Sequence, residues 1–342
     1  MSAGALSARQ ALVAPFFDFL SFPASCVNAL EPCFPAHSGL GNLENLKSLR
    51  NAHARAGSAQ HSIRSHMNIL DILKSILFGI VEGVTEFLPI SSTGHLILLE
   101  DLIHLDQPAE FFNVYKVVIQ LGAILAVVVL YWDRLWPFGR GKSASAKRAT
   151  WQLWGKVAIA CIPAVIVGFF LDDIVDAKLS SPYVVVVMLI VYGIAFIVVE
   201  KMCQGKDFRI KKLSSLDNRT ALFIGMFQVL ALIPGTSRSG ATILGAMLLG
   251  VGRTAAAEFS FFLGIPIVFG AGGLKTLKYF LAGNSFSFDQ WLILLSGTIV
   301  SFLVALVAIR TFVGYIKKHN FTAFGIYRIV LGVVVLIYFA LK

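Results

Sequence analysis

The sequence predicts an all-α polytopic membrane protein, built as an inverted-topology repeat in which each half is a re-entrant helical hairpin plus three transmembrane helices. Three observations lead to this fold class. The chain is 57% hydrophobic and only 14% charged, whereas soluble domains carry about 25% charged residues, and its mean hydropathy is +0.77. Six apolar segments are long enough to cross a bilayer. Two polar stretches that contain Pro and Gly each lie between two shorter apolar segments.

The N-terminal part differs from the rest of the chain because it shows no sustained hydrophobic periodicity. The apolar body has a natural start at Met67. We therefore interpret residues 1–66 as an N-terminal extension that is either disordered or the product of an upstream translation start. Residues 67–342 are interpreted as one integral membrane domain.

Segment length then separates spanning helices from shorter ones. A transmembrane helix needs roughly 20 apolar residues, and the expected spans are about 114–132, 155–171, 182–200, 255–274, 290–310 and 322–341. The segments that are too short lie at about 69–81, 96–103, 220–233 and 241–251. The short pairs flank the polar stretches 82–95 and 234–240. Each set predicts a re-entrant hairpin, which is tolerated at membrane depth where it is buried in protein or lines a wet cavity.

The charges of the loops predict the orientation, because Lys and Arg mark the cytoplasmic side. Segments 133–156 and 201–219 each carry six Lys or Arg residues, so we expect both to be cytoplasmic. The acid-rich segments 100–110 and 172–178 are expected to face outward. The net charge of +10 is therefore explained by loops of a membrane protein rather than by nucleic-acid binding.

The assigned hairpins and spans predict an internal repeat. A hairpin plus three spans occurs twice, and because three is odd, the second copy is inverted relative to the first. Residues 88–92 also align with residues 233–237. Lys275 and Lys278 depart from the charge pattern, since they fall in a predicted outer connection.

Glu82 and Glu86 are the first candidates for chemistry. Four residues apart on a helix, they share one face. Carboxylates in a low dielectric repel each other unless a proton or a cation intervenes, so we expect a shared proton or a divalent cation, Mg²⁺ or Ca²⁺. The alternative is that the pair faces an aqueous surface or makes structural hydrogen bonds.

His95 follows the hydroxyl-rich turn Ser91-Ser92-Thr93-Gly94. Beside the two acids, it is a candidate nucleophile, general acid for a leaving group, or orienter of a serine. The structural alternative is that it caps the next short helix.

Segment 234–242, Pro-Gly-Thr-Ser-Arg-Ser-Gly-Ala-Thr, is the partner stretch. Small residues leave backbone N–H groups free at a helix start, which makes an anion site. Arg238 adds a planar cation that can hold phosphate through two hydrogen bonds. The spacing and lysine of a Walker A loop are missing, and the alternative is a polar helix cap. Acids, hydroxyls and histidine from one hairpin and arginine from the other predict phosphoryl transfer from a lipid-linked phosphate.

Segments 82–95 and 234–242 resemble the two signature stretches of the bacterial undecaprenyl-diphosphatase (bacitracin-resistance) family. The resemblance runs from about Met67 to the C-terminus and includes segments 118–122 and 257–261. The N-terminal extension has no counterpart in a typical member.

The resemblance implies a multi-pass enzyme of the bacterial cytoplasmic membrane whose active site faces the outer side. It would hydrolyse undecaprenyl diphosphate to undecaprenyl phosphate and inorganic phosphate, which recycles the lipid carrier of peptidoglycan synthesis and lowers bacitracin sensitivity. The expected partners are the polyprenyl diphosphate and membrane lipid. A homodimer is left open, and no nucleic acid is expected.

The resemblance and the two polar stretches together give the expected site. The catalytic candidates are Glu82, Glu86, Ser92, His95 and Arg238. The substrate-binding candidates are Ser91, Thr93, Ser237, Ser239 and Thr242. The metal-binding candidates are Glu82 and Glu86.

Two other functions compete with this interpretation. A transporter or lipid flippase is the main alternative, because inverted repeats with broken helices are typical of transporters, but it has no need of hydrolytic groups. A type 2 phosphatidic acid phosphatase is a weaker alternative, since the histidine and aspartate of that family's second signature are missing.

Overall fold

The computed structural model describes residues 69–179 and 181–342. The predicted extension 1–66 and the boundary at residue 67 therefore lie outside the described residues. Within the described part, the chain is helical apart from one isolated β-bridge between Ile210 and Val251. The predicted all-α class is confirmed.

Each of the six predicted spans is a helix long and apolar enough to cross a membrane. The helices are α6 (Ala109–Leu130), α8 (Ala144–Leu179), α9 (Pro182–Cys203), α12 (Arg253–Leu281), α13 (Phe288–Ile316) and α14 (Thr322–Leu341). The predicted loop 172–178 is instead part of α8, and no Gly or Pro lies between Gly168 and Pro182 to end the helix earlier. Two short elements, α7 (Trp132–Leu135) and the 3₁₀ turn η2 (Leu213–Ser215), lie in the basic segments.

The four predicted short helices are also present. They are α4 (Ile69–Thr85), α5 (Ser92–Leu102), α10 (Asn218–Val229), which continues into the 3₁₀ turn η3 (Leu230–Leu232), and α11 (Arg238–Leu248). Both α5 and α11 start in the same way. Ser91 and Ser237 take positive φ angles of 74° and 71°, which is rare for residues other than glycine. Each caps its helix by accepting a hydrogen bond from a glycine N–H three residues on.

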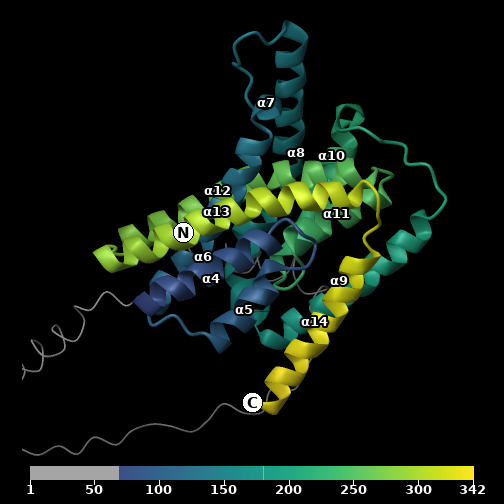
Figure 1. The fold of residues 1–342 in the computed structure, drawn as a ribbon. Coiled ribbons are helices and arrows are strands. Elements are labelled where there is room, and N and C mark those ends of the chain that lie inside the picture. The colour runs from purple at the N-terminus through teal and green to yellow at the C-terminus, as the bar shows by residue number, and fades with distance from the viewer. Residues whose placement is uncertain (1–68, 180) are drawn as a thin grey trace, which may run out of the picture. The chain divides into compact units, whose positions relative to one another are not determined.

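The helices pack in matching pairs. Helix α4 lies along α13, α10 lies along α8, and α9 lies beside α14 (Figure 1). The first two contacts depend on glycine, because a side chain on Gly79 or Gly225 would collide with the backbone of the facing helix. Helix α6 packs against both α12 and α13.

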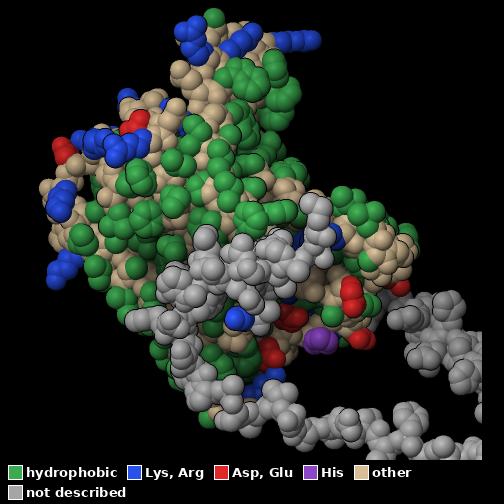
Figure 2. All heavy atoms as spheres, turned by 180° about the vertical axis from the view of Figure 1, so that it is seen from behind, with side chains coloured by type: hydrophobic (Ala, Val, Ile, Leu, Met, Phe, Trp, Pro, Cys, Tyr) green, Lys and Arg blue, Asp and Glu red, His purple; other side chains and the backbone are tan. Residues whose placement is uncertain are grey.

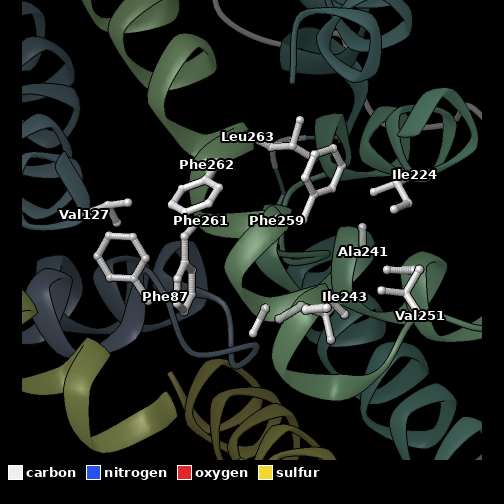
Figure 3. Close-up of a cluster of buried hydrophobic side chains, with 14 of the residues drawn as sticks. Phe87, Val127, Ile224, Ala241, Ile243, Val251, Phe259, Phe261, Phe262 and Leu263 are labelled. Carbon is white, nitrogen blue, oxygen red and sulfur yellow. The ribbon is translucent and has the colours of Figure 1, made fainter. Parts of the chain in front are cut away.

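A large apolar core surrounds the turn after α4 and the N-terminal half of α12. Figure 3 shows Phe87 next to Phe261 and Phe262, with Val127 at one edge. Phe87 and Phe261 are both fully buried and meet edge to face at 5.3 Å between ring centroids. Such a pair adds about 1 kcal/mol to the burial of the rings. The core therefore anchors the turn that carries the predicted site.

The basic segments meet at one end of the bundle. Arg134 is ion-paired with Glu258 at 2.7 Å, and the Ile210 N–H donates to the carbonyl of Gly250. Glu200, at the end of α9, pairs with Arg253 and accepts from the backbone N–H of Phe321. The segments that the charge pattern assigns to one side of the membrane therefore share one end of the structure.

The outer surface between the two ends is apolar. Phe169 and Val307 are 82% and 66% exposed, and Figure 2 shows hydrophobic side chains over broad areas of one face. Lys and Arg side chains gather at its upper tip. Exposed apolar surface on this scale is expected where lipid replaces water, so the chain is a multi-pass membrane protein.

One buried cation joins the turns of the two short-helix pairs. Arg328 of α14 is fully buried and donates to the carbonyl of Pro89 in the first turn. It also donates to Gly235 at 2.8 Å and to Thr236 at 3.1 Å in the second turn. The backbone of both turns is thereby satisfied by a single side chain, as buried carbonyls require.

Candidate active site

Glu86 is the junction of the predicted site. One carboxylate oxygen accepts from the Arg238 guanidinium at 2.9 Å, and the other accepts from the Ser92 hydroxyl at 2.9 Å. Glu86 is 5% exposed. The structure therefore brings together three of the predicted catalytic residues from the two halves of the chain.

Glu82 lies one helical turn before Glu86 and has a different environment. Its side chain is 1% exposed, and neither carboxylate oxygen has a hydrogen-bond donor among the described residues. The Glu86 N–H donates to the Glu82 carbonyl at 3.0 Å, so the helical turn continues to Glu86 and the two carboxyl groups share one face. A buried carboxylate without a donor is costly, so this position favours binding of a proton or of a cation.

Arg238 is held by α12 as well as by Glu86. Its guanidinium donates to the Ser260 carbonyl at 2.7 Å, and it lies against Gly264, where a Cβ atom would come within 2.7 Å of it. The Nε–H of Arg238 is buried without a partner in the described part of the chain. An arginine fixed in this way keeps a donor available for an incoming anion.

The other predicted substrate-binding residues have bonds within the protein. Ser91 and Ser237 cap their helices, and Ser239 donates to the carbonyls of Glu86 and Leu88. Thr242, fully buried, donates to the Ser260 hydroxyl at 2.8 Å. These contacts hold the two turns together, and direct binding of substrate by these four residues stays a prediction.

The hydrogen-bond partners of His95 are Ser91 and Tyr327 rather than the acids. Its Nδ1 lies 2.8 Å from the Ser91 carbonyl, which can only accept, so Nδ1 carries a proton. In the neutral ring, Nε2 therefore accepts from the Tyr327 hydroxyl, 2.8 Å away. The two rings are stacked, with an interplanar angle of 7°. The Ser91 carbonyl thus fixes the tautomer of His95, and Tyr327 fixes the orientation of its ring.

A cavity of about 780 Å³ opens beside the acids. Glu82, Ser92 and Thr93 lie in its wall, together with Gln120 of α6. Lys116, Lys275 and Lys278 line it as well, with Glu100 and Glu110. His95 and Arg238 are not part of the wall, so they reach this space only through Ser92 and Glu86 or after a rearrangement.

The acids would supply two ligands for the predicted cation, which stays a prediction. No group of three or more His, Cys, Asp or Glu side chains that could hold a metal lies within the described residues. Glu82 and Glu86 nevertheless fit Mg²⁺ or Ca²⁺, because Mg²⁺ commonly binds one or two carboxylates and completes its shell with substrate phosphate and water. The unpartnered oxygens of Glu82 are the ones most available for this.

Comparison with known proteins matches residues 75–334 to the family described as bacitracin resistance protein BacA. The chain belongs to this family. The undecaprenyl-diphosphatase of Streptococcus thermophilus is 54% identical over 274 residues, covering 80% of this chain and 95% of the relative. That of Streptococcus equi subsp. equi is 54% identical over 276 residues, covering 81% and 99%. That of Streptococcus mutans is 54% identical over 277 residues, with the same coverage.

In this BacA-family chain, sequence reasoning missed several residues that complete the site. Ser260, which binds both Arg238 and Thr242, gave no signal beyond its place in segment 257–261. Tyr327 lies 232 positions from His95, and no local pattern links them. Lys275 and Lys278 were visible as departures from the charge pattern, and their place on the cavity explains that departure.

We expect Arg238→Met to destabilise the protein strongly, because it leaves Glu82 and Glu86 together without a cation. Removing one partner of a buried pair typically costs about 3–5 kcal/mol. Arg134→Met is the matched control, since the Arg134 side chain is 53% exposed and its pair with Glu258 should contribute about 1 kcal/mol or less. Thermal unfolding in detergent measures both.

The loss of stability in Arg238→Met should become smaller as the pH falls, because protonation removes the repulsion between the two carboxylates. Equal losses for the two variants, at every pH, would contradict the buried pair.

Proposed function

We propose that this chain hydrolyses undecaprenyl diphosphate to undecaprenyl phosphate and inorganic phosphate. The reaction recycles the lipid carrier of cell-wall peptidoglycan synthesis and confers resistance to bacitracin. The observation that carries the proposal is the junction of Glu86, Ser92 and Arg238, in a chain of the BacA family whose relatives are named undecaprenyl-diphosphatase.

The hydrogen bond from Ser92 to Glu86 is the arrangement of a nucleophile and its base. The Ser92 oxygen attacks the terminal phosphorus, its proton passes to Glu86, and the bond from that phosphorus to the bridging oxygen breaks. Undecaprenyl phosphate leaves, and water then hydrolyses the phosphoserine. Arg238, fixed between Glu86 and Ser260, is not on the cavity wall, and a rearrangement that exposes its buried, unpartnered Nε–H would let it donate to the phosphoryl oxygens and stabilise charge in the transition state.

Glu82, joined by Glu86 if it gives up one of its present partners, would hold a divalent cation, Mg²⁺ or Ca²⁺, together with the substrate. The cation neutralises phosphate charge when it is bound. Glu82 suits this role best, because its oxygens have no other partner in the described structure.

The two short-helix pairs are re-entrant hairpins of an inverted repeat. In support, Lys74 near the start of α4 donates to the carbonyl of His104 just after α5, so the first pair begins and ends together. Ile210, ahead of α10, pairs with Gly250 after α11 at the basic end. The basic end faces the cytoplasm, and the cavity faces the outer side of the bacterial cytoplasmic membrane.

Lysines of the cavity attract the diphosphate. Lys275 and Lys278 are exposed, and within the described chain neither has a hydrogen-bond or ion-pair partner. Lys116 lies 3.8 Å from Glu100 across the same wall. Fixed positive charge at the mouth of a cleft raises the rate of anion capture. The flippase alternative gains no comparable support, since the relatives are named as hydrolases.

Phosphate release from undecaprenyl diphosphate by detergent-purified protein tests the function. Hydrolysis should occur without a second compartment and should fall when a chelator removes divalent cations. Ser92→Ala should lower kcat by about a hundredfold or more, and Ser301→Ala, a buried serine of α13, is the control. Full activity of Ser92→Ala would overturn the nucleophile, and no release by wild-type protein would overturn the function.

Tyr327→Phe should lower kcat/KM about fivefold if His95 takes part in the reaction, because one hydrogen bond of about 1 kcal/mol to His95 is lost. The pH profile should shift with it, since Nε2 of His95 loses its hydrogen-bond donor. Tyr183→Phe, at an exposed tyrosine, is the control. Wild-type turnover by His95→Gln would instead leave Tyr327 with a structural role only.

Lys275→Gln with Lys278→Gln should raise KM about tenfold at low salt and leave kcat unchanged. The difference from wild type should vanish at high salt, because screening removes long-range attraction. Lys317→Gln with Lys318→Gln makes the same charge change outside the cavity wall. An equal effect of both double variants would show that net charge, rather than the cavity, governs capture.

A further inference from the structure

A second cavity lies at the basic end of the bundle and is unrelated to the acids. It has a volume of about 580 Å³ and is enclosed by α7, α8, η2 and the first turns of α12. Five cations line it, Arg134, Lys142, Lys156, Lys211 and Lys212, against the two carboxylates of Asp133 and Glu258.

The charge rule for cytoplasmic loops does not by itself explain why these cations face one cavity. The positive-inside rule explains the charge of segments 133–156 and 201–219, but not why lysines from both face one space. Lys147 and Arg148 belong to the same turns of α8 and lie outside the cavity wall. Only some of the cations of this basic segment therefore line the cavity.

Two of the lysines are available for a ligand. Glu258 pairs with Arg134, and Lys142 donates to the carbonyl of Trp136 and to Thr150. Lys156 and Lys212 have no hydrogen-bond or ion-pair partner within residues 69–179 and 181–342. Unpaired ammonium groups facing one cavity are suited to a phosphate anion.

The surroundings indicate that the phosphate belongs to a lipid. One wall is apolar, with Leu153 and the nearly buried Ala255. Close in sequence to lining residues, four exposed aromatic side chains contact one another in a row, Trp132 stacked on Trp136 and the pairs Trp136–Phe138 and Phe138–Trp151 edge to face. Aromatic residues concentrate at the depth of lipid headgroups, and basic pockets at the cytoplasmic side commonly bind anionic headgroups.

We propose that this cavity binds the phosphate headgroup of an anionic phospholipid of the cytoplasmic leaflet. Lys156 and Lys212 contact the phosphate, and the acyl chains lie along the apolar wall beside the aromatic row. The site is separate from the catalytic cavity. It is connected to it through α12, which lines this cavity at Glu258 and holds Arg238 at Ser260.

The test uses the full chain in detergent, with short-chain phosphatidylglycerol as the probe and native mass spectrometry as the readout. Wild-type protein should bind one phosphatidylglycerol in preference to phosphatidylcholine of the same chain length. Lys156→Gln with Lys212→Gln should weaken this binding roughly thirtyfold, since each lysine near the headgroup contributes separately. Lys147→Gln with Arg148→Gln is the matched control on the same helix and should bind as wild type does.

Each other outcome overturns the proposal. Equal loss in both double variants would mean a general charge effect, and no loss in either would place the lipid elsewhere. Inorganic phosphate that displaces phosphatidylglycerol at equal concentration would identify the ligand as a free anion. Unchanged helical circular dichroism of each double variant keeps a folding defect from being mistaken for lost binding.

Discussion

The buried guanidinium of Arg328 is the contact on which the arrangement of the broken helices depends. A helix interrupted at membrane depth leaves carbonyl groups without partners, and each costs several kcal/mol unless protein satisfies it. Arg328 donates to Pro89 in one turn and to Gly235 and Thr236 in the other. Because one planar cation serves both turns, a movement of one turn relative to the other breaks part of this set of hydrogen bonds.

The geometry of Glu86 follows from this constraint. With the turns held together, Arg238 and Ser92 reach opposite oxygens of the same carboxylate. Glu82 is left without a donor one helical turn away. Two carboxylates on one helix face therefore have different environments: one is held in a hydrogen-bonded set, while the other stays available to a proton or cation.

The lysines and arginines also form two groups with different surroundings. At the basic end, cations from segments 133–156 and 201–219 line one cavity, and Lys156 and Lys212 among them have no side-chain partner in the described part of the chain. Lys275 and Lys278 instead lie on the cavity of the acids. Lys275 and Lys278 depart from the charge rule for loops and lie on the surface expected to meet an anionic substrate. Most of the lysines and arginines that follow the rule instead indicate the expected orientation of the chain.

The sequence by itself determined the helices and the two halves of the site. Apolar length, the breaks at Pro89 and Pro234, and the spacing of Glu82 and Glu86 are local properties, so they could be read from short windows. The tertiary structure alone decided which residues meet. The contacts of Arg328 with Pro89, of Tyr327 with His95 and of Ser260 with Arg238 join different helices. Gly264 leaves room for the Arg238 guanidinium and Gly325 lets α14 approach α9 closely, and no local pattern records how distant surfaces fit together.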